Sequence, residues 1–121
     1  MKRILIAEDD SFTMNVYTTR LKKDGYAIEM APDGKAAWEK IKKQSPDLLL
    51  LDMTLPLVSG YELLQMIRDN PSTKNLSVVI ISNTRKEDLP HDISGLNVSK
   101  YFVKVETPID EIASVVKEIL Q

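Results

Sequence analysis

The sequence contains no cysteine and only one histidine, His91. The lack of cysteine excludes disulfide bonds, thiol catalysis and thiolate metal sites, and it is compatible with a reducing cytoplasm. A single histidine excludes a histidine-rich metal centre. The net charge is only −2, so the charge balance does not predict binding to nucleic acid or to an anionic membrane. No apolar run approaches the length of a signal peptide or a membrane span. We therefore expect a soluble cytoplasmic protein with neither nucleic acid nor membrane as a partner.

The length and composition predict one globular domain over residues 1–121. Hydrophobic residues make up 43% of the chain and charged residues 28%, which are the proportions of a soluble protein with a substantial core. The chain shows no repeat, no linker and no low-complexity tract.

Four consecutive leucines at 48–51 predict a strand that is buried on both faces. The run is too short for a helix, and Pro46 and Pro56 bound it on either side. Asp52 follows directly at the point where this strand leaves the sheet. A carboxylate in that position either caps the next element or takes part in chemistry, and the leucine run alone does not decide between the two.

The remaining apolar patterns predict alternating strands and helices along the whole chain. Strands are predicted at 4–7, 26–30, 48–51, 77–82 and 101–103. Helices are predicted at 11–24, at 35–43, from Gly60 to before Pro71, and from Pro108 onward with Thr107 as the N-cap. Residues 85–95 are mostly charged and contain Pro90, so they predict only a short or distorted fifth helix.

Strict alternation of strands and helices predicts an α/β fold, a doubly wound five-stranded parallel sheet with helices on both faces. The second strand alternates apolar and polar residues, a pattern typical of a half-exposed strand at the edge of a sheet. The order 2-1-3-4-5 places that strand at the edge and the first and third strands side by side. This is the flavodoxin-like order.

Polar residues follow the predicted strands: Glu8 and Asp9 after the first, Asp52 after the third, Ser82 at the end of the fourth and Lys104 after the fifth. In such sheets, ligands bind beyond the carboxyl ends of the strands. Two carboxylates about 4 Å apart repel each other by roughly 4 kcal/mol near a protein surface. A divalent cation offsets this repulsion, and oxygen ligands favour Mg²⁺ or Mn²⁺. The pattern predicts a phosphoryl-transfer site with Asp52 as the nucleophile.

Taken in order, these segments resemble the receiver domain of two-component response regulators, in particular a chemotaxis-type single-domain receiver. The resemblance lies in ILIAEDD at 4–10, LLLLDMTLP at 48–56 with Gly60, VVIIS at 78–82 and YFVK at 101–104. It covers essentially the whole chain. Each motif is weak alone, but their order and their positions on the predicted elements make the set specific.

The resemblance implies that Asp52 accepts a phosphoryl group from a phosphohistidine, carried by a sensor histidine kinase or a histidine phosphotransfer protein. It further implies that Mg²⁺ (or Mn²⁺) is bound by Asp9, Asp52 and the backbone carbonyl of Thr54, with Glu8 acting through water. A receiver of this kind catalyses its own phosphorylation and dephosphorylation and switches the binding of a downstream protein. It is a monomer or a phosphorylation-dependent dimer.

Other positions acquire roles from the same resemblance. Ser82 and Lys104 would contact the phosphoryl oxygens, and Ser82 with Tyr101 would form the switch. Thr54 and Thr84 match positions that tune the lifetime of the phosphoryl group, so they would set the rate of dephosphorylation.

Two departures from the family pattern concern the output side of the domain. Val105 follows Lys104 where the family usually has a proline after a cis bond, so this loop is either trans and rearranged or strained. Pro90 falls within the fourth helix of the family. Ser82 replaces the more frequent threonine but keeps the hydroxyl group.

Three alternatives are compatible with parts of the pattern. A haloacid-dehalogenase-type phosphatase needs a second aspartate where this chain has Thr54. A flavodoxin needs a phosphate-binding loop after the first strand, where the acids at 8–10 would repel the phosphate. The nearest alternative is a pseudo-receiver, a phosphorylation-independent protein-interaction module. Val105 favours it, and the intact Asp9, Asp52 and Lys104 oppose it. Whether the chain is a stand-alone receiver, a relay intermediate or part of a longer protein stays open.

Overall fold

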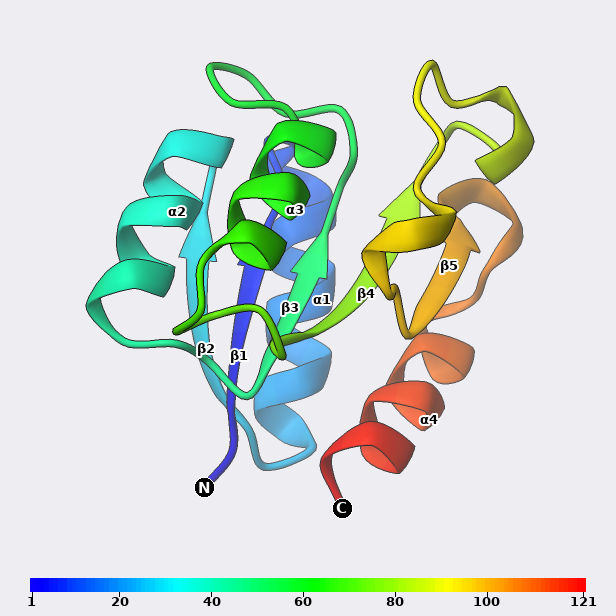
Figure 1. Cartoon of the computed structure of the whole chain (residues 1–121). Helices are drawn as coiled ribbons and strands as arrows, with labels where there is room; N and C mark the ends of the chain where they lie inside the picture. Colours follow the sequence, from blue (N-terminus) through cyan, green and yellow to red (C-terminus); the bar gives the residue numbers. More distant parts are fainter.

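A computed structural model describes residues 1–121 and contains one five-stranded parallel sheet (Figure 1). The strand order is β2-β1-β3-β4-β5, and every neighbouring pair is parallel. The strands are β1 (Arg3–Ala7), β2 (Ala27–Ala31), β3 (Leu48–Leu51), β4 (Ser77–Ser82) and β5 (Lys100–Val103). The predicted fold class, strand order and edge position of the second strand are confirmed.

Four α-helices cover the two faces of the sheet: α1 (Ser11–Lys23), α2 (Gly34–Lys43), α3 (Gly60–Asp69) and α4 (Ile109–Leu120). Helices α2 and α3 lie on one face, and α1 and α4 lie on the other (Figure 1). The alternation of side chains along each strand divides the core accordingly. In β3, Leu49 and Leu51 pack under α2 and α3, whereas Leu48 and Leu50 pack under α1 and α4. All four leucines are buried, as predicted.

Each of the first three helices begins with a side-chain cap close to a strand end. Asp10 accepts a hydrogen bond from the backbone N–H of Thr13 at the start of α1, and Asp33 accepts one from the N–H of Ala36 at the start of α2. Ser59 forms a reciprocal capping box at the start of α3. These caps satisfy N–H groups that would otherwise lack partners, so they fix where the loops above the sheet end.

A regular helix is absent from residues 85–95, in agreement with the prediction of only a short or distorted helix there. The segment contains two short 3₁₀ turns, η1 (Lys86–Asp88) and η2 (Ser94–Leu96), so the chain has four α-helices. Pro90 has no N–H to donate and forces the preceding residue out of the helical region. Leu89 accordingly has an extended backbone, with φ −66° and ψ 143°.

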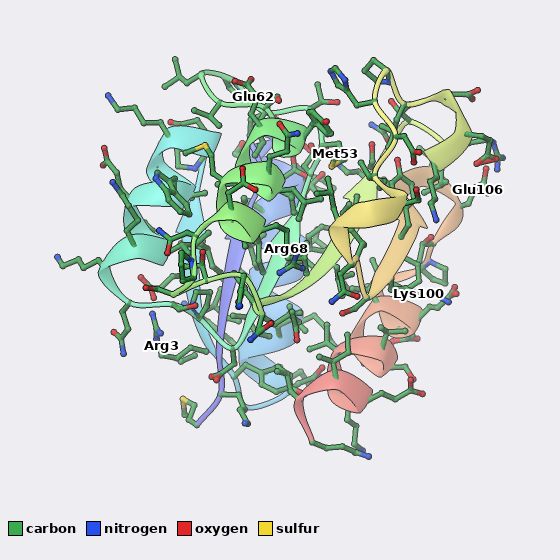
Figure 2. All side chains as sticks on the ribbon, viewed as in Figure 1. Arg3, Met53, Glu62, Arg68, Lys100 and Glu106 are labelled. Carbon is green, nitrogen blue, oxygen red and sulfur yellow. The ribbon has the colours of Figure 1, made fainter.

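Arg68 fastens this helix-free segment to the rest of the fold. Its guanidinium donates hydrogen bonds to the carbonyls of Leu96 and Asn97, and also to those of Lys74 and Leu76 at the entry to β4. Figure 2 shows Arg68 on α3, facing the segment that leads into β5. One side chain of α3 therefore satisfies backbone carbonyls in the segments that lead into β4 and β5.

The start of α4 also differs from the sequence prediction. The N-cap is Pro108, which offers no side-chain hydrogen bond, and the predicted N-cap Thr107 lies one residue earlier. The Thr107 hydroxyl instead donates to the carbonyl of Val103 at 2.8 Å and closes the 3₁₀ turn η3 (Lys104–Glu106). Because the Thr107 hydroxyl is bonded within this turn, it does not cap α4.

Both chain ends lie at the amino-terminal edge of the sheet, at the bottom of Figure 1, opposite the loops that follow the strands. None of the helices combines the length and the apolar composition that crossing a membrane requires.

Candidate acidic site at the carboxyl edge of the sheet

Asp52 lies at the end of β3, anchored by its backbone to the neighbouring strand. Its N–H donates to the carbonyl of Ala7 at 3.0 Å, and its residue surface is only 7% exposed. Glu8 is anchored in the same way, because its N–H donates to the carbonyl of Ala31. It is 2% exposed, whereas Asp9 is open to solvent. The sheet therefore fixes two buried carboxylates side by side and leaves a third at the surface.

These three carboxylates form a cluster that includes one cation. Single oxygens of Glu8, Asp9 and Asp52 lie within 4.8 Å of one another. The ammonium of Lys104 lies 2.6 Å from Glu8 Oε1 and 3.4 Å from Asp52 Oδ2. The predicted convergence of the residues after β1, β3 and β5 is therefore observed in the structure.

Two effects shift the pKa values of Glu8 and Lys104: burial, and the contacts between the Lys104 ammonium and the carboxylates. Burial raises the pKa of Glu8, and the hydrogen bond from Lys104 offsets that effect only in part. Burial alone would lower the pKa of Lys104, but the neighbouring carboxylates Glu8 and Asp52 outweigh it, so this pKa is raised. Lys104 is thus a firmly charged cation within a cluster that has more negative than positive charge.

The composition of the cluster fits a hard divalent cation. Its donors are carboxylate oxygens from three residues whose ligand atoms already lie close together. Thr54 is held beside them, because its backbone N–H donates to Asp52 Oδ1 at 3.1 Å.

Ser82, Thr84 and Tyr101 form a second connected group next to the acidic cluster. Ser82 is fully buried at the end of β4, and its Oγ accepts a hydrogen bond from the N–H of Thr84 at 3.1 Å. The hydroxyl of Tyr101 donates to the carbonyl of the same Thr84. Tyr101 is half-buried, and burial raises the pKa of its phenol. A displacement of Ser82 is therefore linked to Tyr101 through a single backbone segment.

The peptide bond between Lys104 and Val105 is trans, since the chain contains no cis peptide bond. Of the two conformations considered from the sequence, the trans one is observed. Lys104 begins the turn η3, and Val105 is 81% exposed. The loop still places the ammonium of Lys104 on the carboxylates.

Residues 4–117 match the family model of the response regulator receiver domain. The chain belongs to this family. Receivers of two-component systems are phosphorylated on an aspartate and interact with sensor kinases and with downstream targets. Among curated relatives, the response regulator ArlR of Staphylococcus saprophyticus is 32% identical over 123 residues, which cover 100% of this chain and 53% of ArlR. The receiver spans between 11% and 53% of the length of the first curated relatives that it matches.

Two solved receiver structures bear on the acidic cluster. The Mg²⁺–BeF complex of the response regulator TrrA from Thermotoga maritima has a TM-score of 0.85 and 29% identity, covering 99% of this chain and 100% of that one. The Mn²⁺-bound form of the response regulator Rcp1 has a TM-score of 0.80 and 28% identity, covering 95% and 89% of the two chains. Receiver domains thus bind Mg²⁺ or Mn²⁺ at an acidic pocket of this type.

Sequence reasoning missed how this receiver closes the loop after Asp52. A side chain on Gly34 would overlap with the carbonyl of Val58, and one on Gly60 would overlap with Met53. Gly60 also donates its N–H to the carbonyl of Met53 at 3.1 Å. The loop between β3 and α3 therefore depends on two glycines for close backbone approach. Gly60 is visible in the motif, but no local signal relates Gly34 to a loop more than twenty positions away.

Proposed function

We propose that Asp52 is the phosphoacceptor of this receiver and takes a phosphoryl group from a phosphohistidine in a Mg²⁺-dependent reaction. The donor is a sensor histidine kinase or a histidine phosphotransfer protein, and residues 1–121 form one cytoplasmic receiver domain. The observation that carries the proposal is the buried Asp52 carboxylate, 3.4 Å from the Lys104 ammonium and clustered with Glu8 and Asp9. Unlike a capping residue, Asp52 has a charged partner on a distant strand end.

Within this site, Asp9, Asp52 and the backbone carbonyl of Thr54 would hold Mg²⁺ (or Mn²⁺), and Glu8 would act through a water molecule. The three clustered carboxylates support this assignment. When bound, the cation neutralises charge on the phosphoryl oxygens.

The residues of the chain position and stabilise the transferred group. A carboxylate oxygen of Asp52 forms the new bond to phosphorus, and the donor nitrogen leaves with the electron pair of the broken P–N bond. Lys104 lies within reach of Asp52 and would pair with a phosphoryl oxygen. The Ser82 hydroxyl would donate a hydrogen bond to a second phosphoryl oxygen. The chain thereby catalyses its own phosphorylation.

We further propose that the Ser82–Thr84–Tyr101 group transmits the modification to a downstream protein or to a second receiver, so that the chain is a monomer or a phosphorylation-dependent dimer. The hydrogen bonds that meet at Thr84 support this role. Thr54 and Thr84 border the site and would set the rate at which water reaches the phosphoryl group.

Incubation with acetyl phosphate and Mg²⁺, followed by intact-mass measurement, tests the assignment. We expect one added phosphoryl group on the wild-type chain and none on Asp52→Asn. The control Asp69→Asn alters an exposed carboxylate at the end of α3 and should be labelled like the wild type. If the wild type stays unlabelled by acetyl phosphate and by a phosphorylated histidine phosphotransfer protein, the chain is a pseudo-receiver that acts as a phosphorylation-independent interaction module.

A further inference from the structure

A cavity of about 290 Å³ opens beside Asp52, between the loop that follows β3 and the helix-free segment that follows β4. Met53, which Figure 2 labels in the upper part of the molecule, is one of its lining residues. None of its lining residues is an aspartate, glutamate, lysine or arginine. The cavity therefore differs in chemistry from the charged cluster next to it.

Two of the lining residues contact the reacting groups directly. The N–H of Thr54 donates to Asp52 Oδ1 and the N–H of Thr84 donates to Ser82 Oγ, both at 3.1 Å. Thr54 is exposed and Thr84 is half-buried, so both side chains are accessible to a ligand. The cavity therefore adjoins the residues that hydrogen-bond Asp52 and Ser82.

One side of the cavity is lined by the segment that follows the turn η1. Leu89, Pro90 and His91 lie there, and the backbone of Leu89 is extended. The His91 ring stacks on Tyr61 of α3, with ring centroids 4.1 Å apart and planes 12° from parallel. A flat aromatic pair and the Leu89 side chain thus face an apolar space.

From this arrangement we propose that the cavity receives the leaving group of small acyl phosphate donors and selects donors with a planar, apolar acyl group. The inference rests on the proposed role of Asp52 as phosphoacceptor. In the step, an Asp52 oxygen bonds to phosphorus while the bond from phosphorus to the acyl oxygen breaks. The carboxylate leaves with that oxygen and its electron pair.

The chemistry of the walls matches such a leaving group. An aromatic acyl group places its ring against Leu89 and the Tyr61–His91 pair, and its carboxylate remains at the threonine hydroxyls on the rim. The volume lies near the lower limit for ligand pockets, which favours one ring over a larger group. Apolar pockets discriminate by roughly 10- to 200-fold for each methylene they accommodate, so we expect a preference of at least about tenfold.

The test compares benzoyl phosphate with acetyl phosphate on the full chain with Mg²⁺, at equal donor concentrations far below saturation. The rate of phosphoryl addition is followed by intact mass, and the benzoyl-to-acetyl ratio is the readout. We expect a ratio of at least about ten for the wild type. Leu89→Ser and His91→Ala should lower it several-fold. Each ratio is internal to one variant, so a general loss of activity cancels.

Leu57→Ala provides the matched control. Leu57 is a 75% exposed apolar residue on the loop that follows β3, and it does not line the cavity. The labelling rates of this variant with benzoyl phosphate and with acetyl phosphate should therefore stay at the wild-type values. Equal ratios in the wild type, Leu89→Ser and His91→Ala would overturn the leaving-group site while acetyl phosphate labelling still supports Asp52 as the acceptor. Failure of both donors to label the wild type would overturn the proposed function and the leaving-group site together.

Discussion

Lys104 lies closer to Glu8 than to Asp52: its ammonium is 2.6 Å from Glu8 Oε1 and 3.4 Å from Asp52 Oδ2. Glu8 is also the more deeply buried of the two carboxylates. The ammonium therefore compensates a buried carboxylate that the sheet fixes in place, while its contact with Asp52 is longer. This gives Lys104 a stabilising role that does not depend on phosphorylation.

Lys104→Met should lower the free energy of unfolding by roughly 3 kcal/mol in the absence of divalent cations, because it leaves two buried carboxylates without their cation. Millimolar Mg²⁺ should raise the melting temperature of this variant more than that of the wild type, since the metal replaces the missing charge. Melting curves with and without Mg²⁺ measure both effects. Lys22→Met, which removes an exposed lysine of α1, should behave like the wild type. An equal Mg²⁺ shift in all three proteins would contradict the prediction.

Gly34→Ala should destabilise the chain by roughly 3 kcal/mol, because the new Cβ would overlap with the carbonyl of Val58 and displace the loop after β3. Urea unfolding measures the loss of stability. The rate of labelling by acetyl phosphate shows whether the displaced loop also disturbs the reaction at Asp52. Gly95→Ala is the matched control, since a Cβ there meets nothing within 4 Å. We expect its stability to stay within about 0.5 kcal/mol of the wild type. Comparable losses in both variants would show that the close approach to Val58 is not the cause.

Arg68→Met should cost about 2–4 kcal/mol in urea unfolding, because several backbone carbonyls lose a charged donor. Amide hydrogen exchange should also become faster around Leu96 and Asn97. Arg85→Met removes an exposed arginine paired with Glu106, and exposed pairs contribute at most about 1 kcal/mol. If both arginine variants unfold at the same urea concentration, Arg68 does not have the role assigned to it.

The burial of Tyr17 predicts a loss of folding stability at high pH. Burial in the core raises the pKa of its phenol to about 12, from an ordinary value of 10.0. The unfolded chain therefore ionises first, and stability that is fully present below pH 10 should fall as the pH rises toward 12. The maximum loss is roughly 3 kcal/mol. Absorbance of tyrosinate should show a late-titrating component that is absent from Tyr17→Phe, and the variant should lose less stability over the same interval. Simultaneous ionisation of all tyrosines would contradict this.

The sequence was sufficient to predict the sheet and the convergence on Asp52, because both depend on patterns that are local to each strand. Buried leucines, an alternating edge strand and polar residues directly after the strands each leave a signal a few residues long. Lys104 could be placed next to Asp52 because parallel strands bring their carboxyl ends to one edge.

The segment between β4 and β5 could be predicted only in part. Pro90 indicated a disturbed helix, but the hydrogen bonds that hold the end of this segment come from Arg68, a residue of another element. Periodicity gives no indication of a guanidinium bonded to backbone carbonyls at four positions. The cavity beside Asp52 lies between two segments that are distant in the sequence, so the sequence did not reveal it either. Contacts between distant segments determine these features.

The backbone hydrogen bonds of Asp52 and Glu8 join both acids to the central sheet, whereas Thr54, Thr84 and Lys104 lie in the connections after the strands. Connections generally open more readily than core strands, so we expect the two carboxylates to be the less mobile part of the site. We therefore expect temperature and bound proteins to act on the site chiefly through these connections. On the proposed roles of Thr54 and Thr84, substitutions in the loops would change the lifetime of the phosphorylated state and leave the acceptor carboxylate in place.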